Sequence, residues 1–197
     1  MKPIIFTGAS ILGILDGSKT MTRRVVKPQP GGGFDWCRVV QVAHWYHIEA
    51  DLPRPVMHTV TCPYGVPGDR MYVRETWRQS QRGPEYIVYK ADYSQYVKSP
   101  HGRMYRTPMT NDRGSDIWKS PIHMPRWASR IMLEIVNVRV ERLQDITEDD
   151  ARAEGFQLNS IPNRDAFEFE WDYINSKRGY TWKSNPWVWV YQFKVVK

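Results

Sequence analysis

Residues 17–24, Gly-Ser-Lys-Thr-Met-Thr-Arg-Arg, place hydroxyls and cations directly after an apolar run. The side chains with chemistry to offer are those of Lys19, Thr22, Arg23 and Arg24. Arginine supplies a planar fork of N–H donors, lysine a point charge and threonine a hydroxyl, so a turn that gathers them would form a phosphate or oxyanion site. An exposed strand that carries solvated cations explains the same residues. The turn at Gly17 decides between the two interpretations.

Arginine alternates with aromatic residues in two later stretches, 71–78 (MYVRETWR) and 124–130 (MPRWASR). Such interleaving is typical of nucleic-acid contacts, because bases stack on rings and phosphates accept hydrogen bonds from guanidinium groups. Arginine stems that cover the edges of core tryptophans are the structural alternative. The ligand contacts expected in these stretches are Arg74, Glu75, Trp77, Arg126 and Trp127.

Two acids are candidates for a functional role. Glu75 shares one face of an alternating strand with Trp77, so we expect it to point inward and to pair with a lysine or arginine. Glu154 ends a predicted helix that Thr147 caps and Gly155 terminates. A solvated helix end explains the Glu154 carboxylate equally well.

The composition describes a basic chain and argues against several classes of protein. The net charge is +7, and such a basic excess attracts polyanions such as nucleic acid or anionic membranes without choosing between them. No apolar run is long enough to span a membrane, and no signal-peptide pattern is evident, so no membrane association is expected. The isolated Cys37 and Cys62 favour a reducing cytoplasm. No P-loop, dinucleotide fingerprint, hydrolase elbow or zinc-ligand spacing occurs, so no metal or other cofactor is expected.

The positions of the cations in residues 17–24 depend on the predicted helix before this stretch and on the predicted strand that follows the turn. An apolar helix is predicted within residues 4–16, with Thr7 or Ser10 as its cap and Gly17 as its end, and residues 19–27 form a predicted strand. Side chains three residues apart in an ideal strand face opposite sides. Lys19 must therefore lie in the turn, before the regular strand begins, if it is to share a site with Thr22.

The remaining segments predict many strands and few helices. Strands are expected over 36–50, 56–62, 71–78, 86–90, 131–143 and 187–196, and helices over 147–154 and 165–177. Within 131–143 the apolar residues move from odd to even positions, which requires a β-bulge or a barrel corner. We expect a mainly β fold with peripheral α-helices, in which the strands form a closed or nearly closed barrel. A single domain over 1–197 carries long loop insertions at about 28–62 and 79–127.

The spacing Gly-x-Lys followed after four residues by Arg, here Gly17, Lys19 and Arg24, resembles the motif of the ASCH domain family. These domains are small barrels related to the RNA-recognising PUA domain. The order of landmarks is similar too: a helix before the motif, Pro-Gly-Asp-Arg before a strand, a long strand before Ala-Arg-Ala-Glu-Gly-Phe, and a final strand. The resemblance covers most of the chain and extends to the larger members encoded by phages and prophages. It implies a PUA-like β-barrel that recognises RNA or a modified nucleoside.

One branch of that family resembles an acetylcytidine amidohydrolase. It uses a lysine, a threonine three residues later and a glutamate on the helix after the long strand, which match Lys19, Thr22 and Glu154. The resemblance implies that Thr22 attacks the acyl carbonyl and that Lys19, with its pKa lowered by burial, accepts the proton. Glu154 would orient Lys19 or help to protonate the leaving amine, and Arg24 would hold the oxyanion or a phosphate.

Four functions stay open on the sequence. The first is binding of RNA or a modified nucleoside in a basic cleft beside Gly17–Arg24, where Gly17, Lys19, Arg23 and Arg24 would contact the ligand. The second is an acylcytidine amidohydrolase, and the third is a metal-independent ribonuclease. The fourth is a phage-encoded protein that binds a host protein through exposed aromatic residues.

Overall fold

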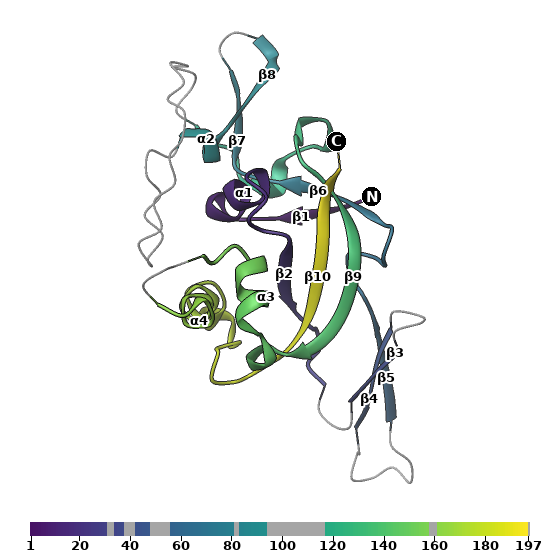
Figure 1. Ribbon diagram of the computed structural model, residues 1–197. Coiled ribbons are helices and arrows are strands. Elements are labelled where there is room, and N and C mark those ends of the chain that lie inside the picture. Colours follow the sequence, from purple (N-terminus) through teal and green to yellow (C-terminus); the bar gives the residue numbers. More distant parts are fainter. Residues whose placement is uncertain are drawn as a thin grey trace.

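The structure of the chain is a computed structural model (Figure 1). It describes residues 1–30, 34–37, 42–47, 56–80, 83–93, 117–157 and 161–196. Strands make up 36% and helices 31%, so the expected predominance of strands is only slight and the content is mixed. Within these ranges, no helix combines the length and the apolar character needed to cross a membrane.

The main sheet has five strands in the order β1–β6–β9–β10–β2. They are β1 (Lys2–Ile5), β2 (Met21–Val25), β6 (Arg70–Arg74), β9 (Met132–Arg142) and β10 (Trp187–Val196). β1 and β6 are parallel and the other pairs are antiparallel. The long strands β9 and β10 curve together through the centre of Figure 1. In the described part of the chain the sheet is open, with β1 and β2 as its edges, so no closed barrel is found there and the expected barrel is not confirmed.

Strand β9 contains the predicted change of phase. Its register against β10 shifts between Gln192 and Phe193, which leaves Val136 as the extra residue. Ile135 and Val138 are both buried, whereas Val136 is exposed. The bulge thus keeps apolar side chains on the core face in both halves of the strand, as the move from odd to even positions predicted.

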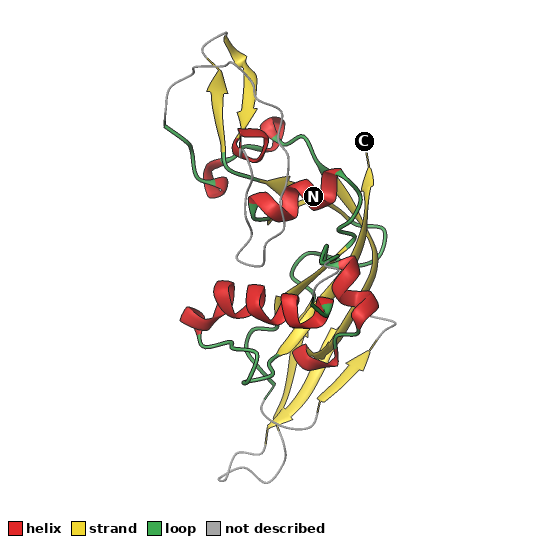
Figure 2. Ribbon diagram, turned by 60° about the vertical axis from the view of Figure 1, so that its left-hand side comes forward, coloured by secondary structure: helices red, strands yellow, loops and turns green. Residues whose placement is uncertain are grey.

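Two segments that were each expected to form one strand are divided between two strands. The insertion 28–62 contains the antiparallel strands β3 (Phe34–Cys37), β4 (Val42–His47) and β5 (Val56–Thr61), so the strand expected over 36–50 is two strands. The strand expected over 71–78 is divided as well: β6 ends, and β7 (Trp77–Ser80) pairs with β8 (Gly83–Tyr89) in a hairpin. The three-stranded sheet and this hairpin project from opposite ends of the molecule in Figures 1 and 2. Residues 94–116 of the expected insertion 79–127 lie outside the described ranges.

The helices are short except for one. The α-helices are α1 (Gly8–Leu15), α2 (Lys90–Tyr93), α3 (Glu148–Ala153) and α4 (Asn163–Asn175). The 3₁₀ turns are η1 (Pro121–His123), η2 (Arg126–Ala128), η3 (Leu143–Asp145) and η4 (Ser176–Arg178). Two predicted caps are confirmed: Thr7 Oγ1 accepts from the Ser10 N–H at 3.3 Å, and Thr147 Oγ1 accepts from the Asp150 N–H at 3.1 Å.

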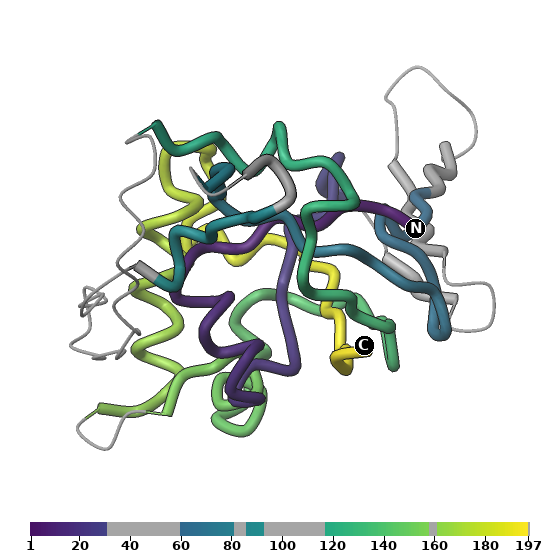
Figure 3. Tube along the Cα trace, turned by 90° about the horizontal axis from the view of Figure 1, so that it is seen from above, coloured from purple at the N-terminus to yellow at the C-terminus, as the bar shows by residue number. Residues whose placement is uncertain are grey.

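Strand β10 is buried on both faces, so it separates two apolar cores. On one face, Trp189, Tyr191 and Phe193 pack in a core with Ile11 and Ile14 of α1. On the other face, Val188 and Val190 pack in a core with Ala151 of α3 and Phe167 and Trp171 of α4. In Figure 1, α4 lies on the opposite side of the molecule from the three-stranded sheet, and Figure 3 shows α4 along one side of the molecule. The second core holds α3 and α4 against the strand that pairs with β2.

Candidate functional site

A turn after α1 places Lys19 ahead of strand β2. Gly17 has a φ of +81°, a left-handed conformation that glycine adopts without the steric cost of a side chain. The Lys19 N–H then donates to the Gly13 carbonyl at 2.8 Å, and Lys19 pairs with Glu154 in an isolated antiparallel bridge. Lys19 therefore stays out of the pleat of β2, which is the condition for sharing a site with Thr22.

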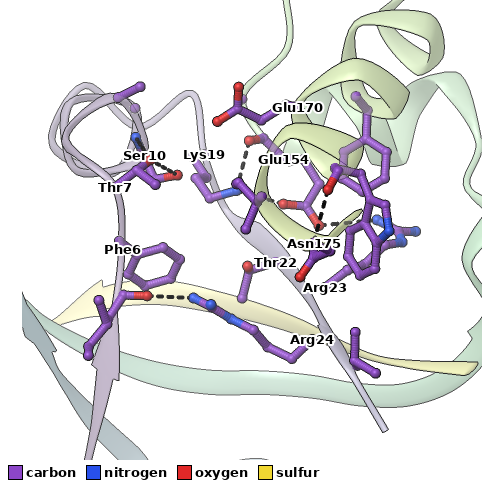
Figure 4. Close-up of a pocket in the computed structure, with 18 of the residues that line it drawn as sticks. Phe6, Thr7, Ser10, Lys19, Thr22, Arg23, Arg24, Glu154, Glu170 and Asn175 are labelled. Atoms are coloured by element: carbon purple, nitrogen blue, oxygen red, sulfur yellow. Dashed lines mark hydrogen bonds and ion pairs between the residues drawn. The ribbon is translucent and has the colours of Figure 1, made fainter. Parts of the chain in front are cut away.

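Lys19 and Glu154 form a buried ion pair (Figure 4). Nζ of Lys19 donates to Oε2 of Glu154 at 2.6 Å and to the Glu154 main-chain oxygen at 2.8 Å. The two residues are only 5% and 6% exposed. Burial lowers the pKa of Lys19 below its ordinary 10.5, although the Glu154 carboxylate opposes the shift. The Lys19 ammonium is thus easier to deprotonate than that of an exposed lysine.

Arg23 is enclosed by three carboxylates. Its Nη2 lies 2.6 Å from an oxygen of Glu141 and 2.6 Å from one of Asp150, and its Nη1 lies 3.4 Å from Oε1 of Glu154. The side chain has no exposed surface. Although the sequence marked Arg23 as a ligand contact, these acids balance its charge. Its visible role is to tie β2 to β9 and to helix α3, which ends at the Glu154 position.

The ion pair lines a cavity of about 660 Å³ formed by residues of β1, α1, β2, β6 and α4. Of the expected site residues, the cavity brings together Lys19, Thr22, Arg23, Arg24, Arg74 and Glu154. In Figure 4 the Thr22 hydroxyl points toward the Lys19–Glu154 pair, and Arg24 lies on the other side of Thr22. Within the described part of the chain, the Thr22 hydroxyl forms no hydrogen bond. This hydroxyl is therefore available to a molecule in the cavity.

Arg24 and Arg74 stand on the cavity wall beside β1. Nη2 of Arg24 donates to the Ile5 carbonyl at 2.7 Å, and the guanidinium lies 5.1 Å from the centroid of the Phe6 ring. Nη1 of Arg74 donates to the Ile122 carbonyl at 3.1 Å. These acceptors are uncharged, so both arginines keep a positive charge that no described carboxylate balances.

The four other ligand contacts expected from 71–78 and 124–130 do not line this cavity. Glu75 is buried and pairs with Arg130 through Nε–Oε1 at 2.9 Å and Nη2–Oε2 at 3.0 Å, which confirms the predicted inward, paired carboxylate. Burial raises the pKa of Glu75, and Arg130 opposes this shift.

Trp77 is buried in a separate apolar cluster, while Arg126 and Trp127 lie exposed on η2. Glu75 and Trp77 lie away from the cavity because the chain leaves the main sheet at the end of β6. Gly17 also lies outside the lining and only shapes the turn.

Aromatic and amide side chains that the sequence did not single out complete the cavity. They are Phe6, Tyr64, Phe156, Trp171, Asn175 and Tyr180. The helix predicted over 165–177 is α4, but the sequence did not indicate what that helix faces. The contact that brings α4 to the cationic stretch includes the Arg23 guanidinium, 5.8 Å from the centroid of the Phe167 ring. Residues so distant in sequence leave no local signal of such a contact.

Among the described residues, no group of three or more His, Cys, Asp or Glu side chains is arranged to hold a metal ion. No known family model matches the chain, and neither a curated protein nor a solved structure matches it. The chemistry of the cavity is therefore the basis for a functional proposal.

Proposed function

We propose that this cavity binds a modified nucleoside, either free or within RNA. The observation that carries the proposal is a concave site of about 660 Å³ in which aromatic walls meet buried, oriented polar groups. Pockets for small organic ligands commonly measure ~300–1,000 Å³ and combine apolar walls with a few placed polar groups. Tyr180 offers an aromatic ring for a base, and Thr22 and Asn175 offer hydrogen-bonding groups.

A second candidate function is hydrolysis of an acyl amide on a cytidine. The observation that favours it is the contact of 2.6 Å between Lys19 and Glu154 in the cavity that Thr22 also lines. A solvent-facing Glu154, far from Lys19, would have argued against catalysis. The lowered pKa of Lys19 suits a general base, because a base must be unprotonated at the working pH.

The proposed hydrolysis proceeds in two steps. The Thr22 hydroxyl oxygen attacks the acyl carbonyl carbon, Lys19 takes the hydroxyl proton, and Arg24 stabilises the oxyanion. Lys19 then gives the proton to the departing amine, the C–N bond breaks, and an acyl ester remains on Thr22. Water, deprotonated by Lys19, attacks the carbonyl carbon of that ester, the bond to the Thr22 oxygen breaks, and Lys19 returns the proton to that oxygen, so the carboxylic acid is released and the Thr22 hydroxyl is restored. Glu154 holds the Lys19 amino group in place and stabilises the ammonium that each proton transfer forms.

The fold is part of the same proposal. We propose an ASCH-type, PUA-like domain that acts in the cytoplasm. Support comes from the helix before the Gly17–Arg24 motif, the strongly curved pair β9–β10 and the α3 helix that brings Glu154 to Lys19. Metal-independent cleavage of RNA stays a prediction that no feature of the cavity favours over amide hydrolysis.

Binding and turnover can be tested with the purified protein and N4-acetylcytidine, without added metal. We expect saturable binding by calorimetry and, for the second candidate, release of acetate. Lys19→Met and Thr22→Val each remove a chemical group with little change of volume. Loss of a general base or a nucleophile typically lowers the rate by on the order of a hundredfold or more.

The chain offers matched controls for both substitutions. Thr20→Val changes an exposed threonine two residues from Thr22, and Lys194→Met changes a lysine whose side chain is 59% exposed and outside the cavity. Both controls should bind and react like the parent. Binding without acetate release in the parent would leave nucleoside recognition as the function and remove the amidohydrolase. No binding of any acylated or unmodified nucleoside would overturn both.

A further inference from the structure

The cavity has an excess of positive charge. Its lining includes six cations and two carboxylates. Lys19 and Arg23 are paired with Glu154. The cations without a described carboxylate in ion-pair contact are Arg24, Lys27, Arg74 and Arg178. Uncompensated cations around a concave, partly apolar site focus a positive potential into it, and that potential favours an anionic ligand.

Two of these cations contribute to the fold and two do not. Arg24 and Arg74 donate to main-chain carbonyls of neighbouring segments. Lys27 is exposed, and its Nζ lies 5.4 Å from the centroid of the Tyr180 ring. Arg178 is exposed, and no hydrogen bond of its guanidinium is formed within the described ranges. Lys27, Arg178 and Tyr180 together are called the basic rim of the cavity below.

The basic rim comes from two segments far apart in sequence. Lys27 follows strand β2, two residues past its end, while Arg178 and Tyr180 follow helix α4. Lys27 offers a point charge and Arg178 a planar fork of N–H donors, which are the two ways in which proteins commonly hold phosphate oxygens. The Tyr180 ring beside Lys27 provides an aromatic face of the kind on which a base or sugar packs.

We propose that the ligand of this cavity carries a phosphate, which the basic rim holds, so that the protein recognises a nucleoside phosphate rather than a bare nucleoside. This inference rests on the proposed nucleoside function. The shared chemistry is a phosphate attached to a nucleoside, whether as a free mononucleotide or as part of an RNA strand. Arg24 and Arg74, which also line the cavity, add positive potential to it.

The test compares three ligands on the intact protein by calorimetry at low salt. They are N4-acetylcytidine, its 5′-monophosphate, and a five-nucleotide RNA that carries the acetylated base. We expect the monophosphate, the RNA or both to bind at least about tenfold more tightly than the nucleoside, and the advantage to shrink as salt screens the charges. A gain for the monophosphate identifies a free mononucleotide, and a gain only for the RNA identifies a strand.

A charge-removing pair of substitutions locates the phosphate. The double variant Lys27→Gln/Arg178→Gln should abolish most of the phosphate advantage while binding of the nucleoside stays within about twofold. The control Arg152→Gln removes an exposed arginine that pairs with Asp149 outside the cavity and should change neither affinity. A parent that binds nucleoside and monophosphate equally, and gains nothing with the RNA, overturns the inference but leaves nucleoside recognition standing. A phosphate advantage that survives in the double variant also overturns it, whereas a parent that binds none of the three ligands overturns the proposed function itself.

Discussion

At the scale of single residues, one carboxylate serves two buried cations. Oε2 of Glu154 contacts Lys19 at 2.6 Å, and Oε1 faces Arg23 at 3.4 Å. Two further acids neutralise Arg23, whereas Glu154 is the carboxylate that pairs with Lys19 in the described structure. The protonation of Lys19 therefore depends on Glu154 more than on any other acid.

Glu154→Gln should lower the pKa of Lys19 further below 10.5. Burial already lowers that pKa, and the substitution removes the negative charge that opposes the shift. The main-chain oxygen at residue 154 still accepts from Nζ, so Lys19 keeps its position. Titration of labelled lysine side chains by NMR, with Lys19→Met for assignment, measures the change.

The lowered pKa of Lys19 determines the direction in which the free energy of unfolding changes with pH. Because the folded pKa of Lys19 lies below 10.5, the unfolded chain binds more protons between these two values. The free energy of unfolding should thus rise with pH across that window, and the window should extend to lower pH in Glu154→Gln. Asp149→Asn is the control, because Asp149 is 88% exposed on the same helix. A Lys19 that titrates at higher pH in Glu154→Gln would contradict the electrostatic account.

At the scale of elements, the close approach of α1 to the turn positions Lys19. Gly13 lies in α1, and a Cβ added there would meet Lys19 Cβ at 3.2 Å and Ser18 Oγ at 3.3 Å. The turn follows at once, with Gly17 in the left-handed conformation. The short helix therefore sets how deeply the lysine enters the cavity.

Gly13→Ala should weaken ligand binding or turnover several-fold without unfolding the protein. Alanine favours an α-helix over glycine by ~1 kcal/mol, which offsets part of the steric cost. The turn must shift by a few tenths of an ångström, and this displaces Lys19 from Glu154. Gly8→Ala is the matched control, because nothing lies within 4 Å of a Cβ added at Gly8. Equal activity of the two variants, with both folded by circular dichroism, would show that the approach of α1 does not position the site.

At the scale of the whole molecule, the net charge of +7 predicts how RNA affinity depends on salt. Each phosphate whose counterion is released contributes a slope of roughly −0.7 in log K against log salt for a single strand. We expect single-stranded RNA to bind at low salt and to lose affinity as salt rises, as measured by fluorescence anisotropy. Uncharged N4-acetylcytidine serves as the internal control, because it releases no counterions. RNA binding that is absent at low salt, or insensitive to salt, would remove RNA as a partner.

Much of the site's local framework could be predicted from the sequence. The Thr7 cap, the turn at Gly17 and the helix from Thr147 to Gly155 depend on residues within a few positions of one another. Local hydrogen bonds and backbone preferences decide such features, so a short window contains the information. The bulge in β9 was predictable for the same reason, since the change of phase is visible within one strand.

The resemblance implied that Lys19, Thr22 and Glu154 act together, but only the tertiary structure decided which other residues share their cavity. Lys19 meets Glu154 across 135 positions, and Arg23 meets Glu141 across 118. Such pairs depend on how the apolar faces pack, because this packing determines which polar groups are buried together. The sequence placed Glu75 and Trp77 on one strand with Arg74, but β6 ends at Arg74, and only Arg74 of these three lines the cavity. Helix α4 became a cavity wall for the same physical reason: the apolar core beneath β10, not a local pattern, positions it.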